Sequence, residues 1–282
     1  MKIIRVNVST STIKYEEIGQ DVLTGGRNLT SRVLKYEINP TCEPLGAYNK
    51  LVLAAGPLSG TYISGANRLS AGGKSPLTGS AKEANGGGVA GLRMGENDIT
   101  GIIIEGRPDS NDLQGLHISS DGARLFKAND LAGKGVYETA EILHQRYGEE
   151  VGLILIGPAG EMKMSGAGVT GTDKDGVPSR YCGRGGMGAV MGAKRIKAVV
   201  IEKGTRRTPK NKAAFRDALR QFNRILKTAP STGKAFPDLG TAEMLDFTVA
   251  LGGLPTRNFT SGSFEFSRSE EHTSELQSHH DL

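Results

Sequence analysis

Short apolar runs alternate with polar and glycine-rich segments over the first part of the chain. Alternating apolar positions predict an opening strand at 2–8 with a hairpin partner at 13–18. Uninterrupted apolar runs predict buried strands at 51–55, 102–105, 153–156 and 198–202, and a second hairpin is expected at 116–126. Apolar residues at helical spacing predict helices at 29–36, 135–147 and 215–226.

The glycine-rich pattern occurs twice. The two copies are NGGGVAGLRMGENDITGIIIEG at 85–106 and GRGGMGAVMGAKRIKAVVIE at 183–202. An offset of 97 places Gly91 on Gly188 and Glu105 on Glu202, and the earlier Gly56-Pro57 is repeated as Gly157-Pro158. Two copies are too few for a solenoid. The repeat therefore predicts a pseudo-symmetric domain with a ligand between its halves.

Composition and charge narrow the class of protein. Of 282 residues 40 are glycine, about twice the usual share, and the net charge is +5. Aromatic residues make up 5% and there is no tryptophan, which disfavours binding of single-stranded nucleic acid. No apolar run approaches the ~18 residues that a membrane span needs. The two cysteines, Cys42 and Cys182, form no Cys-x-x-Cys motif and favour a cytoplasmic protein.

Glycines 183, 185 and 188, with Glu202 downstream, match a dinucleotide-binding fingerprint. The segment before them, GTDKDGVPSRY, is expected to be a loop, whereas that fingerprint follows a buried strand. A dinucleotide-binding protein therefore stays open as an alternative, and so does a non-catalytic β-domain. GGKS at 72–75 is discounted as a phosphate loop because Arg68 stands where the motif needs a glycine.

Three arginines lie among glycines at positions that we take to match around the repeat: Arg68, Arg180 and Arg184. Guanidinium groups beside exposed backbone N–H groups suit an anionic ligand such as a phosphate. Asn85 can hold a turn or ligate a hard cation such as Mg²⁺. Cys182 is expected to be a small buried thiol, and His144 is expected on the surface of its helix.

Several segments taken together carry a resemblance to one family. They are RVNVSTSTI at 5–13, NKLVLAAGPLSGT at 49–61, KSPLTG at 74–79, ANGGG at 84–88, GIIIEG at 101–106, IGPAGE at 156–161 and the 183–202 stretch. Together they resemble the N-terminal domain of the aldehyde ferredoxin oxidoreductase family. Weaker similarity continues through PDLGTAEML at 237–245 and GGLPTRNFTSG at 252–262.

The resemblance implies an α+β fold, in which two β-sheets related by a pseudo-two-fold axis form a saddle for the cofactor. That cofactor is tungsten, or molybdenum, held by the dithiolene sulfurs of two pterins (tungstopterin or molybdopterin) with Mg²⁺ between their phosphates. The family oxidises aldehydes to carboxylic acids and passes electrons through a [4Fe–4S] cluster to ferredoxin. The implied partners are the aldehyde, ferredoxin and, as in many members, a second copy of the chain.

The resemblance also assigns site residues by position. Arg68 would contact one pterin, and Asn85, Gly86 and Gly87 would contact a pterin phosphate, with Asn85 at its magnesium. A clamp from the second half would consist of Arg180, Tyr181, Gly183 and Arg184. Since many members have alanine where Tyr181 stands, its contribution is expected to come from the backbone.

The expected domains are a cofactor-binding domain at 1–208 and the start of a helical domain at 209–267. The polar tail at 268–282 resembles a translated sequencing adapter and is left out of the fold prediction. In the family, the cluster cysteines and the acid/base residues over the metal follow this region. The chain as given is therefore expected to be a truncated oxidoreductase that is inactive by itself.

Overall fold

The structure is a computed structural model that describes residues 1–19 and 24–264. The chain divides into two compact units, Met1–Thr208 and a second unit that begins at Pro209. The 268–282 tail lies outside the described residues. The first unit contains the glycine repeats and the residues of interest.

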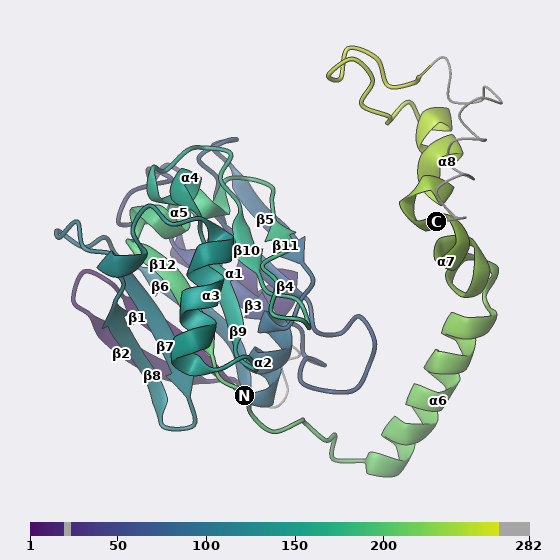
Figure 1. The fold of residues 1–282 in the computed structure, drawn as a ribbon, viewed down its shortest axis with the longest axis horizontal. Coiled ribbons are helices and arrows are strands. Elements are labelled where there is room, and N and C mark those ends of the chain that lie inside the picture. Colours follow the sequence, from purple (N-terminus) through teal and green to yellow (C-terminus); the bar gives the residue numbers. More distant parts are fainter. Residues whose placement is uncertain (20–23, 265–282) are drawn as a thin grey trace. The chain divides into compact units, whose positions relative to one another are not determined.

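Two six-stranded sheets form the first unit (Figure 1). Sheet A contains β1 (Lys2–Asn7), β2 (Thr12–Glu17), β3 (Leu51–Ala55), β4 (Leu69–Lys74), β5 (Ala81–Gly86) and β6 (Ile99–Glu105), in the order β2-β1-β6-β3-β4-β5. Sheet B contains β7 (Gln114–Ser119), β8 (Gly122–Lys127), β9 (Gly152–Leu155), β10 (Val169–Gly171), β11 (Arg180–Cys182) and β12 (Ile196–Ile201), in the order β11-β10-β9-β12-β7-β8. The helices are α1 (Gly26–Glu37), α2 (Ala90–Glu96), α3 (Val136–Tyr147), α4 (Pro158–Glu161) and α5 (Met187–Ala193), with a short turn η1 (Asn129–Leu131).

The two sheets have the same topology. In each, one strand pair is parallel (β1 with β6, β7 with β12) and the other pairs are antiparallel. The parallel pair also has the same register break in both halves, next to Lys2 in sheet A and next to Ile196 in sheet B. The residues that start β6 and β12 follow Asp98 and Arg195, which both have left-handed backbone, with φ of 57° and 56°. The predicted α+β fold of two related halves is therefore confirmed.

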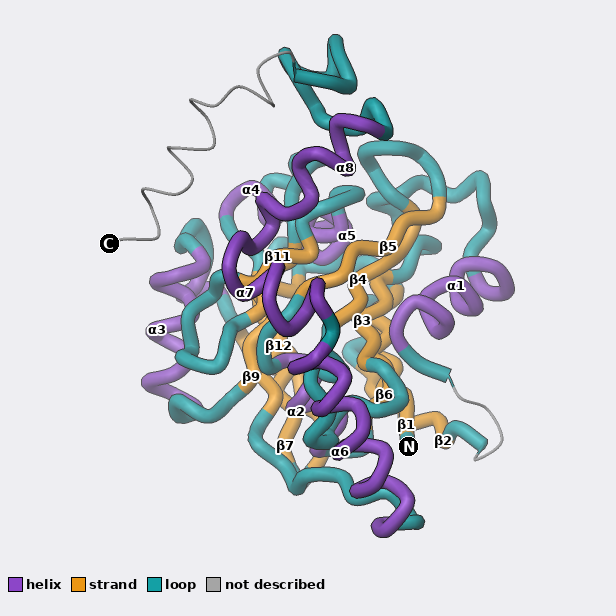
Figure 2. The backbone as a smooth tube through the Cα atoms, turned by 90° about the vertical axis from the view of Figure 1, so that its right-hand side faces the viewer, coloured by secondary structure: helices purple, strands orange, loops and turns teal. Residues whose placement is uncertain are grey.

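The main core lies between the two sheets. Leu51 and Leu53 of β3 point into it, as do Val199 and Ile201 of β12, and each is completely buried. Alternate residues point outward, because successive side chains of a strand face opposite sides. On the outer faces, α1 covers sheet A and α3 covers sheet B with separate apolar clusters. Figure 2 shows these two helices on opposite sides of the paired sheets.

The repeated glycines allow α2 and α5 to pack against backbone. A side chain at Gly91 would strike the carbonyl oxygen of Asn67, and one at Gly188 would strike that of Gly168. The same holds one turn later at Gly192, which faces the Gly160 carbonyl. Close helix-to-backbone packing therefore explains why the repeat retains glycine at these positions.

The predicted strands and helices of this unit are present with boundaries that differ by a few residues. Strands β4, β5, β10 and β11 and helices α2, α4 and α5 were not predicted. The Gly/Ser/Thr-rich segment at 58–88, for which the sequence predicts no helix or strand, contributes β4 and β5 to sheet A. The small residues of β4 and β5 show no alternation of apolar and polar positions. These strands are stabilised by pairing with their neighbours in the sheet.

The second unit is helical in its described part. It contains α6 (Lys212–Thr228), the helical turns η2 (Ser231–Ala235) and η3 (Gly240–Met244), α7 (Phe236–Leu239) and α8 (Leu245–Ala250). The Asn211 side chain caps α6 by accepting a 3.0 Å hydrogen bond from the Ala214 N–H. The helix predicted at 215–226 is confirmed. No helix among the residues that the structure describes is long and apolar enough to cross a membrane.

Candidate functional site

The edges of the two sheets meet where β5 lies beside β11. A Cβ atom at Gly86 would lie 3.0 Å from the Sγ of Cys182, so a larger residue would have to displace that side chain by a few tenths of an ångström. Strand register makes the two segments equivalent: Asn85 pairs with Ser70 as Tyr181 pairs with Thr170. The pseudo-symmetric halves thus bring matching segments, 85–87 and 181–183, together at one place.

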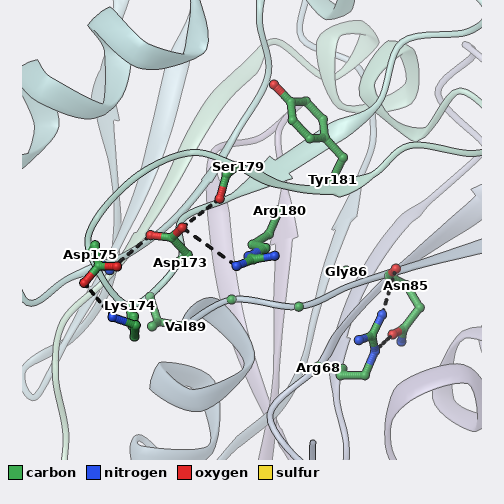
Figure 3. A pocket seen from close by; sticks show the side chains of 12 residues that line it. Arg68, Asn85, Gly86, Val89, Asp173, Lys174, Asp175, Ser179, Arg180 and Tyr181 are labelled. Carbon is green, nitrogen blue, oxygen red and sulfur yellow. Dashed lines mark hydrogen bonds and ion pairs between the residues drawn. The ribbon is translucent and has the colours of Figure 1, made fainter. Parts of the chain in front are cut away.

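A cavity of about 550 Å³ opens at this junction. Its lining is Arg68, Asn85, Gly86, Gly87, Gly88, Val89, Asp173, Lys174, Asp175, Ser179, Arg180 and Tyr181. Figure 3 shows Arg68 with Asn85 at one end of the Gly86–Val89 segment, and Arg180 with the loop from Asp173 toward the other end. Six of the eight residues that the sequence suggested therefore share one cavity.

Arg68 carries an uncompensated positive charge at its end of the cavity. Its Nε donates to the Oδ1 of Asn85, and its Nη2 donates to the Asn85 backbone oxygen at 3.3 Å. No carboxylate of the described residues forms an ion pair with it. A guanidinium held by one neutral amide keeps donors and charge for an anion.

At the other end, Asp173 organises the loop 173–179. Its Oδ1 accepts from the N–H groups of Asp175 (3.0 Å) and Val177 (3.1 Å), and its Oδ2 accepts from the Ser179 hydroxyl at 2.8 Å. Arg180 lies 4.0 Å from the same carboxylate. The Ser179 hydrogen bond, followed by the two backbone hydrogen bonds, holds the pKa of Asp173 below its usual value.

The glycine segment forms the floor between the two arginines. Gly88 has left-handed backbone (φ 96°), and a side chain there would strike the Thr172 carbonyl oxygen. Val89 donates its N–H to that oxygen at 2.9 Å. The N–H groups of Gly87 and Gly88 have no hydrogen-bond acceptor among the described residues. Free backbone N–H groups in a glycine-rich turn can attract anions.

Gly183 and Arg184 do not line this cavity. Both are exposed, and within the described residues the Arg184 side chain forms no hydrogen bond or ion pair. The expectation that the arginines occupy matching places in the repeat is wrong. When the two halves are aligned by strand register, Ser70 corresponds to Thr170. Arg68 then corresponds to Gly168, and Arg180 corresponds to Ala84. The two halves thus supply their arginines from different positions.

His144 is not on the surface, contrary to expectation. Its side chain is 7% exposed, with Nε2 3.2 Å from the Gly176 oxygen of the 173–179 loop and Nδ1 3.2 Å from the Gly148 oxygen. The helix α3 is therefore attached to the loop beside the cavity. Sequence could not reveal this contact, because it joins residues brought together only by the fold.

Cys182 is buried, as expected, and burial raises the pKa of its thiol to about 12. A thiol in this state is inert at neutral pH. Among the residues that the structure describes, no three histidine, cysteine, aspartate or glutamate side chains gather as metal ligands. The lining offers donors for phosphate instead.

The dinucleotide alternative does not fit the topology. β11, which precedes the glycine fingerprint, is an edge strand separated from β12 by β10 and β9. Three successive antiparallel pairings make β11 antiparallel to β12, whereas a Rossmann unit joins parallel strands through its helix. In addition, Gly188 serves the packing of α5 against the 167–168 backbone rather than a ligand.

Comparison with known proteins adds to this picture. The family model described as aldehyde ferredoxin oxidoreductase, N-terminal domain, matches residues 3–203. The tungsten-containing aldehyde ferredoxin oxidoreductase of Pyrococcus abyssi is 36% identical over 269 residues, which cover 94% of this chain and 43% of that protein. Its counterpart in Pyrococcus furiosus is 35% identical over 270 residues, with the same shares covered.

More distant similarities reach other activities. The aliphatic sulfonate oxidoreductase, WOR-like subunit, of Pyrococcus furiosus is 31% identical over 248 residues, covering 78% of this chain and 37% of that protein. Among solved structures, the active site complex BamBC of benzoyl coenzyme A reductase with 1,5-dienoyl-CoA aligns with a TM-score of 0.75 at 26% identity. That alignment covers 82% of this chain and 35% of the other. The chain spans less than half the length of these relatives.

Proposed function

The chain belongs to the aldehyde ferredoxin oxidoreductase family, and we propose that residues 1–208 bind a tungsten or molybdenum bis-pterin cofactor. In this proposal the chain is part of an enzyme that oxidises aldehydes to carboxylic acids and delivers the electrons to ferredoxin. The names of its close relatives support tungsten as the metal. Two free cysteines are compatible with a reducing, cytoplasmic location.

One observation carries the proposal. Arg68, which has no carboxylate partner among the described residues, and Arg180 line a single cavity where equivalent segments of the two halves meet. A cofactor made of two similar phosphate-bearing pterins suits a floor with related halves. The donor chemistry also fits, because guanidinium and backbone N–H groups are phosphate ligands and glycine leaves room for close approach.

Within this assignment the side chains bind and orient. Arg68 and the N–H groups of Gly87 and Gly88 would hold one phosphate, and Arg180 would hold the other. When bound, the cofactor supplies the metal and the dithiolene sulfurs for the redox chemistry. The side-chain oxygen of Asn85 accepts one hydrogen bond, from Arg68, and its second lone pair would remain for Mg²⁺.

We also include Gly183 and Arg184 in the proposal, as contacts outside the cavity. They follow Cys182 directly and are exposed, so they can meet a ligand that extends beyond the cavity. Tyr181 is itself a lining residue, with 51% of its surface exposed. For the [4Fe–4S] cluster we propose ligands outside these 282 residues, since a four-cysteine cluster needs more than Cys42 and Cys182.

Pyrophosphate binding tests the cavity. Calorimetric titration of the chain with pyrophosphate should show saturable binding that Arg68→Gln weakens about tenfold, the size expected for a lost charge-assisted hydrogen bond. Arg180→Gln should weaken binding as well. The matched control is Arg124→Gln, which removes an exposed arginine from β8 and should change only the weak long-range attraction. Equal affinity of the wild type and Arg68→Gln would overturn the proposal.

A further inference from the structure

The two ends of the cavity differ in charge. At the Arg68 end the guanidinium meets only the side-chain and backbone oxygens of Asn85. At the Arg180 end, the Asp173 carboxylate stands 4.0 Å from the guanidinium. Lys174 and Asp175 form a 3.0 Å ion pair with each other there and largely cancel. The Arg68 end is thus net positive, whereas the Arg180 end is close to neutral.

Asp173 does not bind Arg180 tightly. Its oxygens already accept three hydrogen bonds, from Asp175, Val177 and Ser179, and 4.0 Å exceeds hydrogen-bond distance. The same three hydrogen bonds hold the carboxylate in place. Asp173 therefore acts on Arg180 as a fixed negative charge rather than as a ligand that an anion displaces.

A fixed carboxylate beside a guanidinium weakens its attraction for an anion and repels the anion directly. Arg68 has no such neighbour. The same ligand charge is therefore stabilised differently at two ends of one cavity, although the segments 85–87 and 181–183 that meet there are equivalent by register.

We propose that Asp173 is a specificity-determining residue that makes the Arg180 end the weaker of two phosphate subsites, so that the Arg68 end is occupied first. This inference rests on the proposed function, which assigns the two ends to two phosphate groups. It adds an order and an unequal affinity that the near-symmetry of the fold would not suggest.

Phosphate titration followed by nuclear magnetic resonance can read the two ends separately. In the ¹⁵N-labelled 282-residue chain, the Nε–H signals of Arg68 and Arg180 report one end each. On addition of inorganic phosphate, the Arg68 signal should saturate at a concentration about threefold to tenfold below that of Arg180, as for an exposed charge pair. Asp173→Asn should lower the dissociation constant for phosphate at Arg180 by a similar factor and leave the dissociation constant at Arg68 almost unchanged.

Two further variants separate charge from structure. Asp173→Glu keeps the charge beside Arg180, so it should preserve the weak Arg180 end, and the Asp175 and Val177 amide signals report whether the loop persists. Asp121→Asn, a charge change in the β7–β8 turn, is the matched control. Equal constants at the two arginines of the wild type, or no gain in Asp173→Asn, would overturn the inference and leave the proposed function intact. Absence of phosphate binding at both ends would overturn both.

Discussion

At the scale of single residues, equivalent positions of the two halves use different side chains to form a hydrogen bond to the other half. Asn97 follows α2 and donates its amide to the Glu202 oxygen at 2.9 Å. Lys194, its counterpart after α5, donates its ammonium to the Gly106 oxygen at 2.8 Å. Each residue thereby ties its own half to the other. Burial lowers the pKa of Lys194 to about 8 because the charged form loses hydration.

The lowered pKa predicts how stability depends on pH. Between pH 8 and 10.5 the unfolded chain binds more protons at Lys194 than the folded chain, so the free energy of unfolding should rise with pH in this window. The rise from this residue is of the order of 3 kcal/mol. Denaturant unfolding at several pH values should show it in the wild type, whereas Lys194→Met should lack it.

A matched lysine substitution makes that result specific. Lys127 lies exposed on β8, so Lys127→Met should retain the pH dependence of the wild type. If Lys194→Met and the wild type gain equal stability from pH 8 to 10.5, then Lys194 does not carry the effect.

At the scale of elements, each of the short helices α2 and α5 connects an edge strand of its sheet to a central strand. Both helices pack closely against neighbouring backbone, because Gly91, Gly95, Gly188 and Gly192 have no side chain. The helix α5 is buried along its whole length, including Met187 and Met191 in the main core. A glycine-rich sequence that resembles a ligand loop thus serves mainly to pack a helix.

Substitution of one such glycine should be costly. Alanine is a better helix former than glycine by about 1 kcal/mol, but a Cβ at Gly192 would overlap the Gly160 carbonyl oxygen. Overlap with fixed backbone should dominate, so Gly192→Ala should lower the free energy of unfolding by about 2–4 kcal/mol. Gly166→Ala, at an exposed position with nothing within 4 Å, is the control that thermal unfolding should leave near the wild-type midpoint.

The apolar strands could be predicted because their burial is visible as uninterrupted or alternating apolar residues, as at Leu51–Ala55. LSAGGK in β4 and RYC in β11 carry no such signal, since their order comes from partners and from close approach at Gly86. The helices α2 and α5 were hidden by glycines that usually disfavour helix. Elements with a pattern of buried apolar residues can thus be predicted from the sequence, whereas elements that depend on contacts with neighbouring segments cannot.

For the site, the family resemblance suggested Arg68, Asn85 and Arg180, and the fold brings all three to one cavity. The Asp173 loop was read only as polar. Its role depends on where one carboxylate points relative to Arg180 and on the attachment of Gly176 to His144. Such relations arise between segments distant in sequence, and no local pattern encodes them.

At the scale of the molecule, the chain offers a pseudo-symmetric floor and little that performs chemistry directly. In its described residues, arginine side chains and glycine N–H groups lie together at the junction of the two sheets. Cys182, next to this junction, is buried and unreactive. The chain spans 43% of the length of its Pyrococcus relatives. The central claim is therefore cofactor binding at the junction.

The most direct test measures the cofactor itself. The 282-residue chain and its Arg68→Gln/Arg180→Gln double variant would be produced in an anaerobic host supplied with tungstate, and folded protein would be analysed for tungsten and pterin. The account predicts that the wild type retains both and that the double variant loses most of both. A folded wild-type chain without pterin or tungsten, or a double variant with wild-type amounts, would contradict it.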